Sequence, residues 1–446
     1  MKAIKKLAEQ FFSFSKGKVV RNLALVAVTT LLVKGIGFFK ELVIASNLGL
    51  SELLDTYLIA LLIPGFISTV FLGSYKSVFI PNYIFARNNG ENSAQFLGSS
   101  LLVTLVIGLF FMLIAYLFGD LYLEFFFQGH SPEYYELIKK QLYLLLPCII
   151  FWSMSSLFSG LLNIDKEFFW SSLTGIFIPL VIIILLLFFK SELQEYVLAA
   201  GTLIGAIINT FYLIFICHKR GILSVKKPNL KSQGVLQMIK QLPAKISSAL
   251  INGLNEPVDQ FFSAQLAVGS ISALNYGIKL PAFAIGIVGI AIGNVILPYF
   301  SEIAALSLKA VYQRLEKILL IAFISCGCIS ALFFLLSEPM IAFVFQRDEF
   351  TTTDTNLVYP IQQMYALQIP FYIMGIVLNR FLTSINKNNF LVISSILSLL
   401  LNIVLNFWLI DTLGIKGLAL ATSIVSLINT VVIYIYIKSI KKNINV

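Results

Sequence analysis

Residues 278–298 read IKLPAFAIGIVGIAIGNVILP, an apolar and glycine-rich stretch with a proline near its start and another at its end. A similar stretch, LLIPGFISTVFLGSYKSVFIP, occupies residues 61–81, and its two prolines are the same number of residues apart. Proline and glycine weaken the backbone hydrogen bonding of a long apolar helix, so we expect two broken helices at equivalent positions of a duplicated chain. The expected hinge residues are Pro64, Gly73, Pro81, Pro281, Gly293 and Pro298.

The composition places the chain in a membrane. Hydrophobic residues make up 58% of the sequence and charged residues only 12%, and the mean hydropathy is +0.89. Soluble domains carry about a quarter charged residues, so that class is excluded. Apolar runs of about 20 residues, enough to cross a bilayer as a helix, recur along the chain. They predict an all-α protein with twelve spans, at 22–46, 55–84, 95–119, 137–161, 167–189, 194–217, 236–266, 272–300, 311–336, 358–383, 388–410 and 416–437.

Positive charge predicts the orientation of these spans. Lys and Arg accumulate in cytoplasmic loops, and the segment before the first span carries Lys5, Lys6 and Lys16. With twelve spans, the other strongly basic loops fall on the same side as both termini, which are therefore expected in the cytoplasm. The net charge of +10 fits contact with anionic membrane lipids. Nucleic acid is not an expected partner, because no basic segment is interleaved with aromatic residues outside the spans.

The repeat also predicts the domain organisation. The longest polar stretch, HKRGILSVKKPNLKSQG, lies at residues 218–234, near the middle of the chain. We expect it to be a cytoplasmic linker between a six-helix lobe at 1–217 and a second at 235–446. Because six spans separate the two copies, both run in the same direction, and the lobes are related by a pseudo-two-fold axis along the membrane normal. A duplicated bundle already supplies both halves of a transporter, which predicts a monomer.

Metal and redox chemistry are not expected. The four cysteines fall within or at the ends of predicted spans, and Cys326 and Cys328 are two residues apart, which places them on different sides of a helix. The only histidines, His130 and His218, lie in or beside loops. We therefore predict no metal site, no cofactor and no catalytic residue.

Charged residues inside the spans are the most informative for function. They are costly in hydrocarbon and usually face a wet cavity or one another. Two interpretations remain: structural ion pairs, such as Lys40 with Asp55 or Lys279 with Asp259, or lysines that bind an anion such as a diphosphate, with carboxylates that tune the site or carry a coupling ion. Lys76 and Arg380 are expected to reach the membrane surface instead. The residues considered for the site are Lys34, Lys40, Glu41, Asp55, Lys245, Glu256, Asp259 and Lys279.

Two blocks of sequence resemble a known family. The segment GLNEPVDQFFSAQLAVGSISALNYGIKLPAFAIGIVGIAIGNVILPYFSEIA is similar to the seventh and eighth helices of the MurJ/MviN lipid II flippases, within the multidrug/oligosaccharidyl-lipid/polysaccharide exporter superfamily. The opening block VKGIGFFKELVIASNLGLSELLDTYLIALLIPGF resembles the first two helices of that family. Weaker similarity runs through GLLN and NRFLTSINKNN.

The resemblance implies two six-helix lobes around a cationic cavity in a bacterial plasma membrane. It implies transport without catalysis: a polyprenyl-diphosphate-linked oligosaccharide, of the lipid II type used for peptidoglycan, would be moved to the outer leaflet by alternating access. The family's cavity arginines fall on Lys34, Lys40 and Lys279, and its acidic residue falls on Asp55. The arginines that the family has near Ser68 and Thr69 are absent.

Other functions remain open. A flippase for another undecaprenyl-linked glycan, such as an O-antigen or capsule unit, shares the predicted cavity. A multidrug exporter of the same superfamily fits a cationic cavity less well, because typical drugs are cations. A membrane glycosyltransferase or polymerase would need catalytic groups on a sizeable outer loop, and a scaffold would not need intramembrane lysines. Coupling to the membrane potential, Na⁺ or H⁺ could act through Glu41, Asp55, Glu256 or Asp259.

Overall fold

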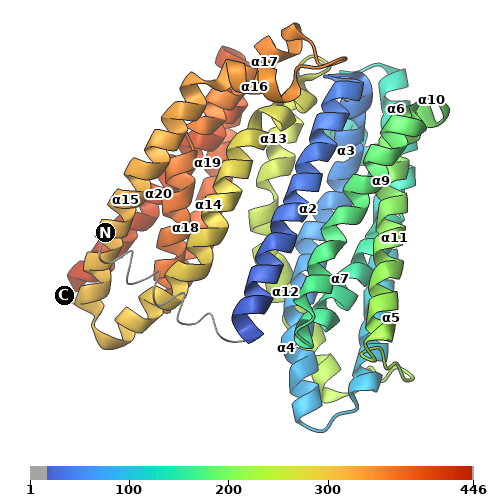
Figure 1. Ribbon diagram of the computed structural model, residues 1–446, viewed down its shortest axis with the longest axis vertical. Coiled ribbons are helices and arrows are strands. Elements are labelled where there is room, and N and C mark those ends of the chain that lie inside the picture. The colour runs from blue at the N-terminus through green and yellow to red at the C-terminus, as the bar shows by residue number, and fades with distance from the viewer. Residues whose placement is uncertain (1–17, 128, 444–446) are drawn as a thin grey trace. The chain divides into compact units, whose positions relative to one another are not determined.

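The computed structural model describes residues 18–127 and 129–443, and every regular element in these residues is a helix (Figure 1). The N-terminal basic segment before residue 18 lies outside the described residues. The elements of the first half are α2 (Lys18–Leu48), α3 (Glu52–Ile67), η2 (Ser68–Leu72), α4 (Gly73–Asn88), α5 (Ser93–Phe126), α6 (Pro132–Leu145), α7 (Cys148–Ile164), α8 (Phe168–Ser172), η3 (Leu173–Ile176), α9 (Phe177–Phe188), α10 (Lys190–Leu193), η4 (Gln194–Tyr196) and α11 (Val197–Lys219).

The second half of the chain is also helical. Its elements are α12 (Gln233–Gly253), α13 (Asn255–Ser263), α14 (Ser270–Leu306), α15 (Leu308–Leu335), α16 (Ser337–Phe345), α17 (Thr352–Ala366), α18 (Ile369–Ser384), α19 (Asn389–Leu413) and α20 (Ile415–Asn443). Ten helical segments of the described chain are long and apolar enough to cross a membrane. α2, with 31 residues, and α12, with 21, occupy the positions of the first and seventh predicted spans.

The chain divides into two compact units, each described here by itself. Unit 1 comprises residues 1–44, 60–121 and 135–249, and unit 2 comprises residues 45–59, 122–134 and 250–446. Residues 235–249, which the sequence assigns to the second lobe, therefore lie in unit 1. The reason is local: α12 is amphipathic, and Val235, Met238 and Leu242 are buried in the same core as residues of α4, α5, α7 and α11.

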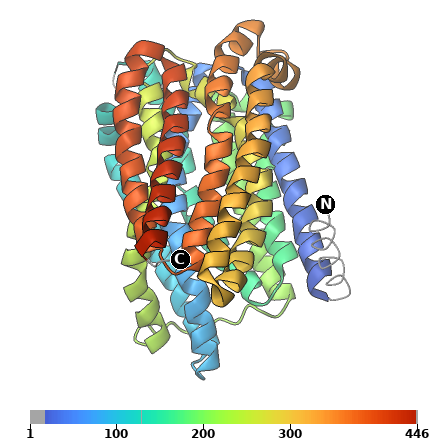
Figure 2. The same cartoon turned by 90° about the vertical axis from the view of Figure 1, so that its left-hand side faces the viewer.

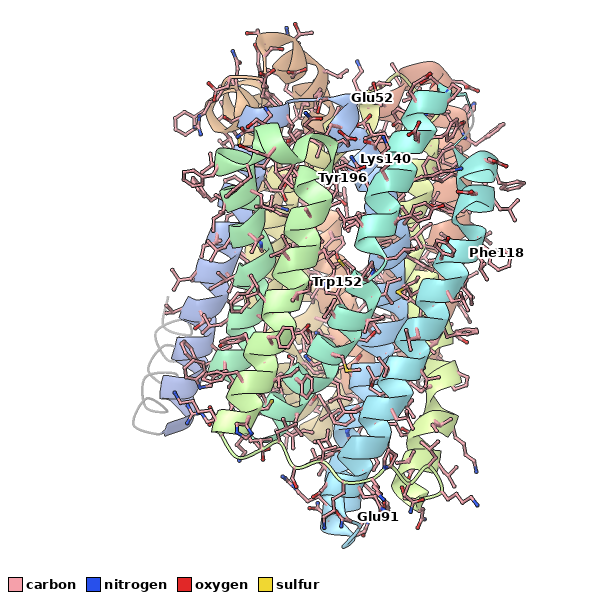
Figure 3. All side chains as sticks on the ribbon, turned by 90° about the vertical axis from the view of Figure 1, so that its right-hand side faces the viewer. Glu52, Glu91, Phe118, Lys140, Trp152 and Tyr196 are labelled. Carbon is pink, nitrogen blue, oxygen red and sulfur yellow. The ribbon has the colours of Figure 1, made fainter. Side chains whose placement is uncertain are left out.

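Unit 1 combines close helix packing in its interior with an apolar outer surface. Close packing of α9 on α11 depends on Gly201 and Gly205, where an added Cβ would lie 2.8 Å from Ile182 Cγ1 and 2.6 Å from Ile178 Cα, respectively. On α5, by contrast, large apolar side chains are exposed, as expected of a lipid-facing surface. Figure 3 shows Phe118 projecting from α5, with charged Lys140 and Glu91 at opposite ends of the unit.

The segment between α11 and α12 lies against the start of α5 in unit 1. The backbone N–H of Lys226 donates to the Ala94 carbonyl at 3.0 Å, and that of Asn229 donates to Ser99 Oγ at 2.7 Å. Gly98 lies directly beneath the Lys226 carbonyl, where any Cβ would overlap the backbone. The Gly234 N–H donates to Glu91 Oε1 at 3.1 Å. The polar linker predicted from the sequence, residues 220–232 here, is therefore held in place by hydrogen bonds to α5 and, at the start of α12, to Glu91, and we call it the strap.

In unit 2, the long helices pack side by side around α14. α14, α15, α18 and α20 share a buried core that includes Phe300, Leu315, Phe381 and Ile433, and Figure 2 shows α19 beside α20. Gly277 lets α14 approach α17, since an added Cβ would lie 2.6 Å from Ile361 Cγ2.

The two proline-bracketed stretches differ in structure. α14 runs without interruption through both Pro281 and Pro298, so the prediction of a broken helix is wrong for the second copy. In the first copy, Pro64 and Pro81 also lie inside helices, and the interruption is the π-helix η2 between them. A proline removes one N–H donor, and a long helix in a packed bundle tolerates this loss when the freed carbonyl finds another partner.

Candidate functional site

The lysines of α2 belong to unit 1. Lys34 is exposed, and Lys40 is partly buried beside Glu41, with Nζ 2.8 Å from Glu41 Oε1 and side chains 21% and 16% exposed. Lys34 and Glu41 are seven residues apart and share a face of the helix. The three residues together contribute one net positive charge rather than two, because Glu41 offsets one of the lysines.

Asp55, at the start of α3, lies in unit 2 and is 1% exposed. Its Oδ2 accepts the Gly269 N–H at 2.6 Å, and its Oδ1 accepts the Ser272 N–H at 2.7 Å and the Ser272 hydroxyl. These donors form the first turn of α14, whose cap residue Gly269 has a φ of 92°. Asp55 therefore caps the α14 N-terminus in place of the absent local side-chain cap, where a negative charge complements the helix dipole.

Lys279 lies on α14 in unit 2, two residues before Pro281, and its side chain is partly buried. Further along α14, Gly293 faces Arg380 of α18: an added Cβ would lie 3.7 Å from Arg380 Nη2. Lys279 and Gly293 are 14 residues apart, close to four helical turns, so they share a face of α14 at a separation of about 21 Å. Arg380, which the sequence predicts to reach the membrane surface, is exposed, and its guanidinium lies close to Gly293 on this face.

Asp259 is at the centre of a polar cluster in unit 2. Its Oδ1 accepts the amide groups of Asn402 at 3.1 Å and Asn406 at 2.7 Å, and its Oδ2 accepts the Thr422 hydroxyl at 3.2 Å. Asn406 also donates to Asn402 Oδ1, and its own Oδ1 is buried without a hydrogen-bond partner in the described residues. The cluster thus joins α13, α19 and α20 and contains an oxygen that can accept one more donor or a cation.

Sequence reasoning named Asp259 but missed its three partners. A signal was present, because Asn402 and Asn406 are one helical turn apart in the otherwise apolar stretch LLLNIVLNFWLI. Two amides on one face of a membrane helix indicate a polar partner on a neighbouring helix.

The remaining predicted site residues are distributed through both units. Lys245 is exposed on α12, and its backbone carbonyl accepts the Ser74 hydroxyl at 3.2 Å. The side chain of Glu256 lies outside the described part of the structure. The structure brings together Lys40 with Glu41 within unit 1. Within unit 2 it brings together Asp55 with the start of α14, and Asp259 with its amide cluster.

Comparison with known proteins identifies the family. The family model described as lipid II flippase MurJ matches residues 44–444. The chain belongs to the lipid II flippase MurJ family. The probable lipid II flippase MurJ of Buchnera aphidicola subsp. Schizaphis graminum is 29% identical, with 93% of this chain and 82% of the relative covered. The lipid II flippase MurJ of Thermosipho africanus is 27% identical, with 93% and 85% covered.

Solved structures agree with this family assignment. A lipid II flippase MurJ in an inward closed conformation matches with a TM-score of 0.82 at 27% identity, covering 93% of this chain and 87% of that one. An inward-facing MATE multidrug transporter of the MOP superfamily matches with a TM-score of 0.73 at 15% identity, covering 96% of this chain and 99% of that one, which shows a shared fold alone. Membership in the MurJ family and the apolar helices make the chain a multi-pass inner-membrane protein with the predicted all-α, two-lobe fold.

Proposed function

We propose that this protein is a lipid II flippase, which moves a polyprenyl-diphosphate-linked peptidoglycan precursor from the cytoplasmic to the outer leaflet by alternating access. The observation that carries the proposal is the match to the MurJ family model over residues 44–444. No bond is made or broken in such a movement, so the protein acts as a transporter and not as an enzyme. The positive charge of its predicted cytoplasmic loops favours cytoplasmic termini and contact with anionic lipids. The duplicated bundle favours a monomer.

Charged side chains on membrane-length helices support a diphosphate-bearing substrate. Lys34 and Lys40 on α2, and Lys279 on α14, place ammonium groups where lipid-facing helices carry apolar residues. A lysine is a compact point charge that holds a phosphate without the fixed fork of an arginine. In a partly desolvated site this attraction is stronger than in water.

Complementation tests the substrate directly. The chain is expressed in a strain depleted of its own lipid II flippase and, in parallel, in a strain that lacks its O-antigen-unit flippase. We expect rescue of growth and cell shape in the first strain. Rescue of the second strain alone would contradict the proposal and favour a flippase for another undecaprenyl-linked glycan. Lys34→Ala and Lys279→Ala proteins, expressed at equal levels, are expected to lose rescue, whereas Lys309→Ala, an exposed lysine at the start of α15, should retain it.

For energy coupling, we propose that Asp259 carries the coupling ion, Na⁺ or H⁺. The support is its cluster of amide and hydroxyl groups and the unpartnered Asn406 Oδ1, an oxygen set that can accept a small hard cation or a proton. In proteoliposomes, transport by the unmodified protein should respond to a Na⁺ or a pH gradient, and Asp259→Asn should remove that response. Transport that follows the membrane potential alone, and equally in both proteins, would contradict this proposal.

A further inference from the structure

A polar face runs along the first repeat helix of unit 1. Thr69 of η2 and Gly73 and Ser77 of α4 are exposed, four residues apart, and an added Cβ at Gly73 would have no atom within 4 Å. Between residues 60 and 84 no large apolar side chain is exposed, whereas α5 of the same unit exposes Leu105, Leu109 and Leu113. Lipid-facing positions carry apolar residues, so α5 faces lipid and the polar face of η2 and α4 faces water or a polar ligand.

Lys76 borders this polar face. Its side chain is partly buried, and Nζ donates to Ser159 Oγ of α7 at 3.0 Å. The sequence predicts that Lys76 extends toward the membrane surface; in the structure its ammonium has a hydrogen-bond partner on α7 within the unit.

The ammonium of Lys76 has unused binding capacity. It offers three donors, and Ser159 is a single neutral acceptor. No ion pair in the described chain joins Lys76 to a carboxylate. A cation in a membrane-spanning segment without an anionic partner costs several kcal/mol on insertion scales, so an anionic group on this face would be bound favourably.

The backbone beside Lys76 is specialised. Serine hydroxyls bond to two carbonyl groups of the π-helix η2: Ser74 Oγ donates to the Val70 carbonyl at 2.6 Å, and Ser156 Oγ of α7 donates to the Leu72 carbonyl at 3.2 Å. Isolated π-helical turns occur frequently at functional sites. Here the wide turn lies directly before the segment that carries Lys76, and α7 bonds to both.

Unit 2 carries a cation at the equivalent helix contact. Aligning Pro64 with Pro281 places Lys76 opposite Gly293, the residue that faces Arg380 of α18. α7 and α18 end in the same way, which identifies them as equivalent helices. Just after each helix a residue has a positive φ: 63° at Lys166 and 56° at Asn386. The N–H of the next residue then donates to the carbonyl five residues back, from Glu167 to Leu162 and from Lys387 to Leu382. Each unit thus places one basic side chain where its repeat helix meets this partner helix.

From these observations we infer that Lys76 is a substrate-binding residue, which contacts the diphosphate of the transported lipid along the polar face formed by Thr69, Gly73 and Ser77. The inference rests on the proposed function, since it takes its anion from a lipid-linked diphosphate. Lys76 supplies charge, and Ser159 orients the ammonium toward the face.

Lipid binding by the purified full-length protein tests the inference. The probes are undecaprenyl diphosphate, undecaprenyl monophosphate and undecaprenol, titrated against protein in nanodiscs. Lys76→Gln should weaken diphosphate binding about tenfold, which corresponds to about 1.4 kcal/mol, and should leave undecaprenol binding unchanged. Lys76→Arg should keep diphosphate binding within about threefold of the unmodified protein, because the charge is retained. Lys240→Gln, which removes an exposed lysine of α12 in the same unit, serves as the control.

The outcomes separate the inference from the proposed function. If the unmodified protein prefers the diphosphate to undecaprenol but Lys76→Gln binds it equally well, the inference is wrong and the proposed function stands. If Lys76→Gln weakens all three lipids alike, Lys76 only holds α4 against α7, and the inference is again wrong. If the unmodified protein shows no preference for the diphosphate, the proposed function itself fails, and the role of Lys76 fails with it.

Discussion

The capping of α14 by Asp55 makes a quantitative prediction for Asp55→Asn. In the native arrangement the carboxylate accepts two backbone N–H groups and one hydroxyl while 1% exposed. Asparagine has the same shape but only one acceptor oxygen. If that oxygen stays with Ser272, the amide NH₂ faces the Gly269 N–H, and two donors then point at each other.

The expected cost follows from the interactions lost. A hydrogen bond to a charged group contributes roughly 1.5–3 kcal/mol, and a negative charge at a partly buried helix N-terminus contributes up to about 2 kcal/mol. Because Ser272 keeps its acceptor, we expect a net loss of about 2 kcal/mol. At tenfold per 1.4 kcal/mol, this loss makes opening of the first turn of α14 about 30 times more frequent.

Hydrogen–deuterium exchange of a peptide that covers the first turn of α14 measures this opening. The exchange rate should rise about 30-fold in Asp55→Asn and more in Asp55→Ala, with much smaller changes in α19 and α20. The control is Glu52→Gln, three residues earlier on the exposed side of α3, which should exchange like the unmodified protein. Exchange in Asp55→Asn within threefold of the control would refute the capping account.

Two further predictions concern Gly98 and Gly205, where an added Cβ would overlap the backbone of a neighbouring segment. Gly98→Ala places a Cβ against the Lys226 carbonyl and should release the strap, the segment between α11 and α12, from α5. Trypsin should then cleave after the exposed Lys226 about tenfold faster. The control is Gly65→Ala, whose new Cβ has no atom within 4 Å and which should not change the cleavage rate. Gly205→Ala pushes α9 away from α11 at Ile178 and should lower the free energy of unfolding by about 1–3 kcal/mol, measured as a lower midpoint of thermal unfolding in detergent. Gly327→Ala, in an open position on α15, should leave the midpoint unchanged. Equal midpoints for the two variants would contradict the packing argument.

Much of the fold could be predicted from the sequence because the decisive information is local. An apolar run of membrane length must form a helix, since hydrocarbon leaves no other partner for its backbone. The blocks that begin at Val33 and Gly253 similarly carried the family resemblance, which the match over residues 44–444 confirms.

The partners of the charged residues could not be predicted in the same way, because they depend on contacts far apart in the sequence. Asp55 bonds to residues more than 200 positions away, and Asp259 to residues more than 140 positions away. The sequence shows that such a charge needs a partner, but the partner can be a backbone N–H or a neutral amide as readily as an opposite charge. The ion pairs considered from the sequence were limited to charged residues and could not include these neutral donors.

The two repeat helices show why equivalent sequence positions need not carry equivalent residues. Ser74, whose hydroxyl bonds to a carbonyl of the π-helix, aligns with Ala291, which has no hydroxyl, and α14 is α-helical through this region. Lys76 aligns with Gly293, and the absence of a side chain there leaves room for Arg380 to approach from α18. The cation is therefore supplied by the repeat helix in unit 1 and by its neighbour in unit 2. A binding site requires a charge at a given place in the folded unit, whichever helix supplies it. Aligning the two repeats for matching lysines therefore misses the equivalence of Lys76 and Arg380, whereas comparing the helix contacts of each unit shows it.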